Sequence, residues 1–186
     1  MKVRPEDSLK IENIVASAKV TDYLDLPVLA TKIKDAEYNK KRFPGVVLRM
    51  QDPKIAALVF GSGKVVLTGA KSIDSLSKGL TILGGLLRKQ GIDIPKKLDY
   101  KVQNIVTSAD LATPINLNKI AVGFNLDRIE YEPEQFPGLV YRLDNPKVVV
   151  LLFGSGKLII TGGKEPKDAK EAVIKILSDL RSLGLM

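Results

Sequence analysis

The sequence predicts an α+β fold made of two copies of one half, with a continuous antiparallel sheet and long helices on one side of it. Three features support this prediction: an internal duplication, short apolar segments joined by tight turns, and an amphipathic helix pattern that closes each copy. The period of about 90 residues exceeds that of solenoid repeats. We therefore expect two copies of a small α+β unit, packed as a pseudo-dimer.

The duplication is clearest in the middle of each copy, where residues 37–71 and 130–164 are identical at 18 of 35 positions. The shared motifs stand 93 residues apart: Glu37-Tyr38 with Glu130-Tyr131, Phe43-Pro44-Gly45 with Phe136-Pro137-Gly138, and Gly61-Ser62-Gly63-Lys64 with Gly154-Ser155-Gly156-Lys157. We expect a short N-terminal tail over 1–10, a first half over 11–101 and a second half over 102–186. Together they should form one intertwined structural unit.

Each half begins with the pattern of a strand followed by a helix start. Apolar strands are expected at 11–20 and 102–111. Asp25 and Asn116 follow them as helix N-caps, because their side chains accept hydrogen bonds from the first helical N–H groups. One or two short helices should follow each N-cap.

Several antiparallel strands come next, separated by turn residues. In the first copy they are expected at roughly 37–42, 45–51, 55–60 and 64–69. The segments Asp52-Pro53-Lys54 and Gly61-Ser62-Gly63 are typical of tight connections, which make the flanking strands neighbours.

Each half closes with a helix that has one apolar face. The apolar residues step by three or four positions: Ile73, Leu76, Leu80, Leu83 and Leu87 in the first copy, and Ala169, Val173, Ile176, Leu180 and Leu183 in the second. Helices on one side can cover only one face of the sheet.

The strands are apolar on both faces. In 55–60 and 148–153 both alternate sets of side chains are hydrophobic, whereas a solvated sheet face should carry polar residues. A large exposed apolar face indicates a binding partner. The alternative is that further helices or a dimer partner bury it, but too few helices are predicted for that.

Phenylalanines mark the rims of this face. Four of the five form the repeat-related pairs Phe43/Phe136 and Phe60/Phe153, which lie at or beside turns. A strand phenylalanine usually packs in a core, but turns are where core burial is least expected. Paired apolar side chains at symmetric rims are suited to unstack and kink a nucleic-acid duplex.

Composition favours a polyanionic partner and disfavours catalysis. Lys and Arg outnumber Asp and Glu by 29 to 21, a formal charge of +8, which fits nucleic acid and equally fits a well-solvated surface. The absence of Cys and His excludes thiolate zinc sites and disulfides, and removes the commonest general base and metal ligand. We expect no enzyme, cofactor or metal, and no signal peptide or membrane span.

The motifs resemble the TATA-binding protein family from about Ile11 to Leu183. The markers in the first copy are Asn13-Ile14-Val15, Glu37-Tyr38-Asn39, Lys41-Arg42-Phe43, Ser62-Gly63-Lys64 and Leu67-Thr68-Gly69-Ala70-Lys71. Those in the second are Gln103-Asn104-Ile105-Val106, Tyr131-Glu132-Pro133-Glu134, Phe136-Pro137-Gly138-Leu139 and Leu151-Leu152-Phe153. The resemblance implies a two-fold pseudo-symmetric saddle of about ten antiparallel strands, with helices on its convex face and its concave face in the DNA minor groove. It also implies a general transcription factor that binds the TATA box, kinks it and nucleates the preinitiation complex.

By matching position, the resemblance assigns roles to individual residues. The kinking residues are Phe43, Phe60, Phe136 and Phe153. The base-contacting residues are Asn13, Val15, Leu58, Val66, Thr68, Asn104, Val106, Leu151, Ile159 and Thr161, together with Pro44 and Pro137. The phosphate-contacting residues are Arg49, Lys64, Arg142, Lys157, Ser62 and Ser155. Pro44 stands where family members often have alanine, and Ile159 where valine is usual, so the contact shape should differ modestly.

The two rims differ in charge. Segment 37–42 sums to +2, whereas segment 130–135 sums to −3. The resemblance implies that Glu132 and Glu134 contact transcription factor B, which positions RNA polymerase. The long N-terminal extension of many eukaryotic members is missing, so we expect an archaeal, cytoplasmic and nucleoid-associated protein, or a nuclear one if the chain is a truncated eukaryotic core.

Other functions fit the sequence less well. The Gly61–Lys64 segment lacks the spacing of a phosphate-binding Walker loop and is expected to be a hairpin turn. Related half-saddles occur in DNA glycosylases and ribonucleases, but the sequence contains no separate catalytic domain. A single-strand binder needs aromatics at the sheet centre. The alternative function is a carrier of an apolar ligand or a self-associating protein, with the concave face as the pocket or as a homodimer interface without DNA.

Overall fold

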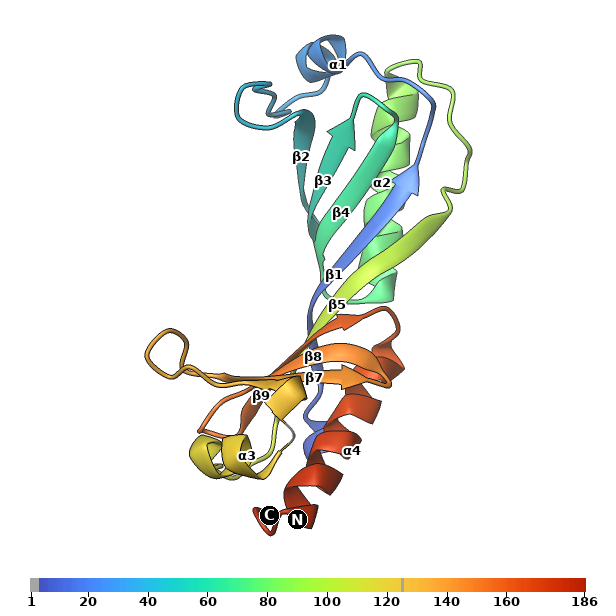
Figure 1. Ribbon diagram of the computed structural model, residues 1–186. Coiled ribbons are helices and arrows are strands. Elements are labelled where there is room, and N and C mark those ends of the chain that lie inside the picture. Colours follow the sequence, from blue (N-terminus) through green and yellow to red (C-terminus); the bar gives the residue numbers. More distant parts are fainter. Residues whose placement is uncertain (1–3, 125) are drawn as a thin grey trace. The chain divides into compact units, whose positions relative to one another are not determined.

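The computed structural model describes residues 4–124 and 126–186 (Figure 1). The elements follow in the order η1 (Pro5–Asp7), β1 (Lys10–Lys19), α1 (Leu26–Lys32), β2 (Gly45–Gln51), β3 (Lys54–Phe60), β4 (Lys64–Ala70), α2 (Ile73–Lys89), β5 (Tyr100–Asp110), α3 (Leu117–Gly123), η2 (Leu126–Arg128), β6 (Ile129–Glu130), β7 (Leu139–Asp144), β8 (Lys147–Leu152), β9 (Lys157–Gly163) and α4 (Pro166–Ser182). The described strands form a nine-stranded antiparallel sheet in the order β2-β3-β4-β1-β5-β9-β8-β7-β6. The predicted α+β class is therefore confirmed.

The chain divides into two compact units, each of which carries one copy of the repeat. The first-repeat unit is Asn13–Gln103. The second-repeat unit combines the segment up to Glu12 with Asn104–Met186. Strands β1 and β5 each cross from one unit to the other, so both units contain a stretch of each strand.

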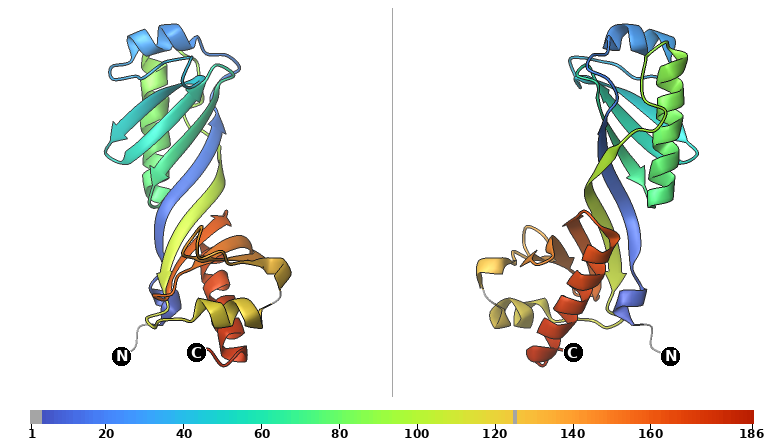
Figure 2. Two further views of the ribbon diagram at one scale, coloured as in Figure 1. Left: turned by 60° about the vertical axis from the view of Figure 1, so that its left-hand side comes forward. Right: turned by 90° about the vertical axis from the view of Figure 1, so that its right-hand side faces the viewer.

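In the first-repeat unit, helix α2 packs on one face of the strands (Figure 2). The predicted apolar stripe points into this contact, because Leu76, Leu83 and Leu87 are fully buried. Each such leucine contributes roughly 1.5–3 kcal/mol through the apolar area removed from water. Ser72 starts the helix: its hydroxyl accepts from the Ser75 N–H at 3.0 Å.

The second-repeat unit repeats this packing with helix α4 against β8 and β9. Val173, Ile176 and Leu180, on the side of this helix that faces the strands, are fully buried, as the sequence predicts. Tyr141 lies in the same core, where its hydroxyl donates to Asp179 Oδ2 at 2.9 Å and its ring stacks on Phe124. Burial and the Asp179 carboxylate raise the pKa of Tyr141 to about 12.

The short helices begin where the sequence predicts. Asp25 accepts a hydrogen bond from the Val28 N–H at 3.1 Å, and Asn116 accepts one from the Lys119 N–H at 3.0 Å. Each side chain satisfies one N–H that has no partner within its helix. Among the described residues, no helix is both long and apolar enough to cross a membrane.

The expected strand over 37–42 is wrong beyond its first residue. Glu37 forms a single bridge with Val47, and the chain then turns, with the N–H groups of Arg42 and Phe43 both donating to the Asn39 carbonyl at 2.9 Å. The Asn39 side chain accepts from the Lys41 N–H and supports this turn. In the second repeat the equivalent segment forms the two-residue strand β6 and then another turn. Both rims therefore consist mainly of turns.

Candidate functional site

Each unit has one sheet face that none of its described helices covers, which we call its open face. In β3 the residues facing α2, such as Ala57 and Val59, are fully buried, whereas Leu58 and Phe60 on the other side are only half-buried. This difference follows from the two-residue period of a strand. The strand register places Val47, Leu58, Val66 and Ser17 in one row across the open face of the first-repeat unit.

The open face of the second-repeat unit has the same construction. Its row consists of Val140, Leu151, Ile159 and Ser108, one residue from each of four strands. All four side chains are half-buried. In each row three of the four side chains are branched aliphatic and only the serine is polar, whereas a solvated sheet face should carry mostly polar residues.

Asn13 stands at an irregularity between β1 and β4. The pairing slips between Ile14 and Ala16, where Val15 lies opposite both Thr68 and Gly69. Such a bulge leaves a backbone group without a ladder partner. Here the Gly69 N–H donates to Asn13 Oδ1 at 2.7 Å, and Gly69 has a φ of +101°, which favours glycine.

The amide of Asn13 is thereby oriented. Its Nδ2 group donates to Thr68 Oγ1 at 3.2 Å, which leaves a second N–H on Asn13 and the hydroxyl hydrogen of Thr68 for another acceptor. Asn104 has a similar arrangement, with Gly162 N–H donating to its Oδ1 at 2.6 Å and its Nδ2 donating to Thr161 Oγ1 at 3.2 Å. The Thr161 hydroxyl also lies 3.4 Å from Asn104 Oδ1, a long hydrogen bond that it would exchange for a closer acceptor. Each open face therefore carries one pair of polar groups that can donate, beside half-buried Val15 or Val106.

A pair of phenylalanine rings lies at the rim of each open face. Phe43 and Phe60 meet edge to face with their centroids 5.6 Å apart, and Phe136 and Phe153 do so at 5.9 Å. Phe136 is 38% exposed. Pro44 and Pro137 are exposed in the loops that bring each chain to its pair.

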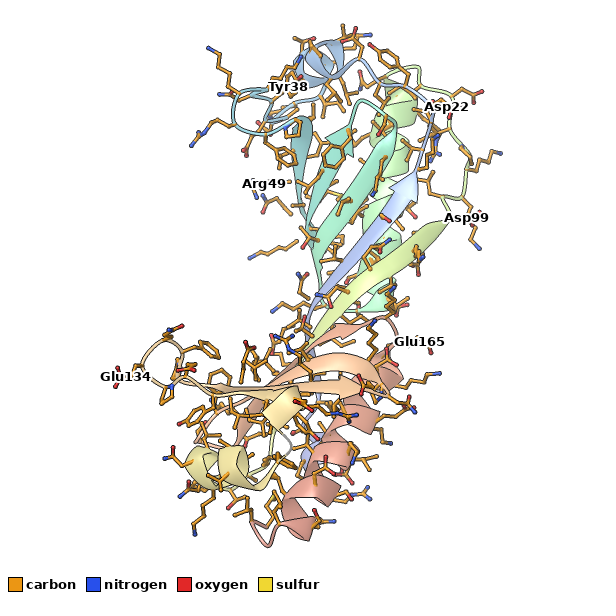
Figure 3. All side chains as sticks on the ribbon, viewed as in Figure 1. Asp22, Tyr38, Arg49, Asp99, Glu134 and Glu165 are labelled. Carbon is orange, nitrogen blue, oxygen red and sulfur yellow. The ribbon has the colours of Figure 1, made fainter. Side chains whose placement is uncertain are left out.

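The basic residues assigned to phosphate lie at the outer strands and in the turns. Arg49, which lies on β2 and is labelled in Figure 3, pairs with Glu37 at 3.0 Å, and Arg142, on β7, pairs with Glu130 at 2.9 Å. These four side chains are mostly exposed, so the ion pairs contribute little to stability and leave the guanidinium groups within reach of a ligand. Lys64 and Lys157 are exposed at the starts of β4 and β9, and Ser62 and Ser155 are exposed in the preceding turns.

Glu132 and Glu134 lie apart from the sheet surface. Both are exposed in the loop between β6 and β7, where Figure 3 labels Glu134. The N–H groups of Gln135 and Phe136 donate to the Glu132 carbonyl at 2.9 Å, so this loop is a compact turn. The backbone that carries both residues is therefore held next to Phe136 at the rim.

The sequence motifs did not identify several residues of the open faces. Val47 and Val140 complete the aliphatic rows, and alternation along β2 and β7 from Arg49 and Arg142 would have found them. Gly45 and Gly138 lie beneath the ring pairs: a Cβ at Gly138 would be 2.7 Å from Phe136 Cε1. The repeated Phe-Pro-Gly motif was the available signal for these two glycines.

Comparison with known proteins identifies the family of this chain. The family model described as "Transcription factor TFIID (or TATA-binding protein, TBP)" matches residues 8–90 and 99–183. The chain belongs to the TATA-binding protein family.

Individual members of this family match over nearly their whole length. The TATA-box-binding protein of Archaeoglobus fulgidus is 56% identical over 178 residues, which covers 96% of this chain and 97% of the relative. TATA-box-binding protein E of Halobacterium salinarum is 57% identical over 182 residues and covers 98% of both. The solved structure of Methanococcus jannaschii TBP superposes with a TM-score of 0.85 at 48% identity, covering 94% of this chain and 99% of that one. These relatives are TATA-binding transcription factors, and none of the similarities indicates an enzyme.

Proposed function

We propose that this chain is a general transcription factor that binds the TATA box in the DNA minor groove, kinks the duplex and nucleates the preinitiation complex. Membership of the TATA-binding protein family supports the proposal. The observation that carries it is the repeated polar pair, Asn13 with Thr68 and Asn104 with Thr161, beside an aliphatic row on each open face. Both open faces would contact the same duplex.

The polar pairs suit the acceptors of the minor groove. Each asparagine oxygen is already bonded to a glycine N–H, so the groups left over are donors. A·T and T·A pairs present only the N3 and O2 acceptors in the minor groove. Asn13, Thr68, Asn104 and Thr161 would therefore donate to base edges without distinguishing A·T from T·A.

The aliphatic rows supply the preference against G·C. Guanine adds an amino group to the minor groove. Against Leu58 and Val66, or Leu151 and Ile159, that group would lose its water without gaining an acceptor, at a cost of about 1–3 kcal/mol. Val15 and Val106 would extend the same dry contact. AT-rich sites are favoured because they avoid this cost.

The phenylalanine pairs would act as wedges. A ring inserted between base steps unstacks them and bends the duplex away from the protein, and the bend allows more contact along both open faces. Flexible TA steps lower the cost of this deformation. Pro44 and Pro137 would contact base edges beside the wedges. Arg49, Arg142, Lys64 and Lys157, with Ser62 and Ser155, would bind the flanking phosphates.

Assembly with other factors would use the acidic rim. Glu132 and Glu134 are exposed and held in a compact turn, which suits contact with a basic surface of transcription factor B. RNA polymerase would then be recruited indirectly. Because the matching relatives are archaeal, we expect the protein to act in the cytoplasm at the nucleoid.

The test is fluorescence-anisotropy binding to an end-labelled duplex with a TATA-type site, against a GC-substituted duplex, across a salt series. Affinity for the TATA site should exceed that for the control by at least about 10³-fold, with each substituted pair costing roughly 1–3 kcal/mol. Equal and steeply salt-dependent affinity for both duplexes would mean that the protein binds DNA without sequence preference, as a basic DNA-coating protein does. Absence of binding would favour an apolar-ligand carrier or a homodimer that forms through the open faces. Sedimentation would then distinguish the homodimer from a monomer.

A further inference from the structure

Two lysines of the first-repeat unit lie directly opposite each other on neighbouring strands. Lys19 ends β1 and Lys64 begins β4, and the two are partners in the strand register. Like charges in directly opposed positions of a sheet destabilise it. The opposed lysines therefore add nothing to the stability of the fold. Their two positive charges are instead suited to a ligand with negative charge.

The two lysines line a surface hollow that contains further donors. The hollow has a volume of about 510 Å³, and its lining includes Lys101 and the hydroxyl-bearing residues Ser17, Ser62 and Tyr100. Ser17 Oγ accepts from Gln103 Nε2 at 2.8 Å, which leaves its own hydrogen for another acceptor. The hollow is thus lined by three lysines and three hydroxyl-bearing residues, and ammonium and hydroxyl groups are donors that suit the oxygens of a phosphate group.

Two carboxylates lie beside this hollow and balance part of its charge. Lys19 Nζ is 2.7 Å from Asp22 Oδ1, and Asp99 lines the hollow (Figure 3 labels both aspartates). The hydrogen bond and charge of Lys19 lower the pKa of Asp22. However, the Asp22 side chain is 96% exposed, and ion pairs this exposed are weak enough to exchange for another anion.

The equivalent corner of the second-repeat unit has a different charge. There Asp110 occupies the place of Lys19 and lies opposite Lys157 in the register. Lys10, which corresponds to Lys101, is 3.9 Å from Glu12, and Ser108 donates to that same carboxylate at 2.7 Å. The lysines of this corner therefore have carboxylates as neighbours on the strands themselves.

We propose that the ammonium groups of Lys19, Lys64 and Lys101 contact a DNA backbone phosphate directly, and that Asp110 weakens the matching contact of the second repeat. This inference rests on the proposed DNA binding and adds Lys19 and Lys101 to the residues that contact DNA. It makes backbone anchoring stronger in the first repeat than in the second. A nearly symmetric protein thereby binds the two ends of its site with unequal strength.

The first test compares Lys19→Gln with Lys78→Gln, in which an exposed lysine of α2 is changed instead. Each phosphate contact contributes about 0.9 to the slope of log Kobs against log salt concentration. On the TATA duplex, Lys19→Gln should lower that slope by about this amount, and Lys78→Gln should leave it at the wild-type value. Lys101→Gln provides an independent repeat of the measurement should Lys19→Gln impair folding.

The second test measures the affinity of Asp110→Asn for the TATA duplex. This variant retains the oxygen that accepts the Ala112 N–H at 2.8 Å. Removal of the negative charge should tighten binding to the TATA duplex. The inference is overturned if Lys19→Gln and Lys101→Gln keep the wild-type slope, or if Asp110→Asn binds no more tightly, while the wild type still prefers the TATA site. If the wild type itself shows no preference for the TATA site, the proposed function is overturned instead.

Discussion

Phe136 and Phe153 meet edge to face above Gly138, with their ring centroids 5.9 Å apart. Such aromatic pairs are worth about 0.5–1.5 kcal/mol beyond the area they bury. The contact holds two half-exposed rings in one orientation at the rim of the open face. If the rings are wedges, their mutual support reduces the freedom that they lose on insertion between bases.

Phe136→Ala should weaken DNA binding and bending while leaving the fold intact. Phe136 is 38% exposed, so its removal costs little core packing. Loss of one wedge should raise Kd for the TATA duplex about tenfold or more. Fluorescence energy transfer between the duplex ends would measure the bend. Phe124→Ala is the matched control, because Phe124 stacks on Tyr141 at 5.0 Å and its loss should lower thermal stability without changing the bend.

Gly138→Ala should disturb the ring pair without removing an aromatic side chain. The added Cβ would lie 2.7 Å from Phe136 Cε1 and 3.1 Å from Phe153 Cε1, so both rings must move. We expect a smaller bend with an unfolding free energy close to that of the wild type. In Gly45→Ala the Cβ would also lie 2.9 Å from the Val59 carbonyl oxygen, which is backbone and cannot move as freely. That variant should lose about 1–3 kcal/mol of stability in urea unfolding.

Asn13→Asp tests the orientation of the polar pair. The carboxylate retains an oxygen for the Gly69 N–H but replaces the Nδ2 donor with an acceptor. Facing N3 and O2 of the bases, it should reduce affinity for the TATA duplex by about 10²-fold or more, since a buried unpaired charge costs several kcal/mol. Circular dichroism should show a folded protein. Near-normal binding by this variant would exclude Asn13 from the base contacts.

Glu132→Arg combined with Glu134→Arg should separate DNA binding from factor recruitment. Both residues are exposed in the β6–β7 loop, so the fold and the TATA affinity should persist. A gel-shift assay should then show the binary complex with DNA but no slower complex with transcription factor B. Glu171→Arg on α4, also exposed, is the control and should still form the slower complex.

Tyr141→Phe should remove a stability change at high pH. The pKa of Tyr141 in the folded protein is about 12, above its ordinary value of 10.0, so folding favours the neutral phenol. The stability that this provides is fully present below pH 10 and decreases as the pH rises toward 12. The difference in unfolding free energy between wild type and variant should therefore shrink over this range. Urea unfolding at successive pH values would measure it, and a constant difference would contradict the assignment.

Local and periodic features were determined by the sequence alone. The duplication predicted two equivalent halves, and the three-and-four spacing from Leu76 to Leu87 predicted the buried side of α2. Asp25 and Asn116 predicted the helix starts because an N-cap depends only on residues a few positions away. The apolar residues in both alternate sets of the strands around Leu58 and Leu151 likewise predicted an apolar face without a helix over it.

Contacts between distant segments were decided only by the tertiary structure. Residues 37–42 were expected as a strand, but the Asn39 carbonyl closes a turn there, and only Glu37 reaches Val47. The bond from Gly69 to Asn13 depends on a slip in the register of β1 and β4, which has no local sequence signal. The opposition of Lys19 to Lys64, against Asp110 to Lys157, also depends on which strands pair. Periodicity shows which face a side chain takes, whereas its neighbours across the sheet follow from the folded chain.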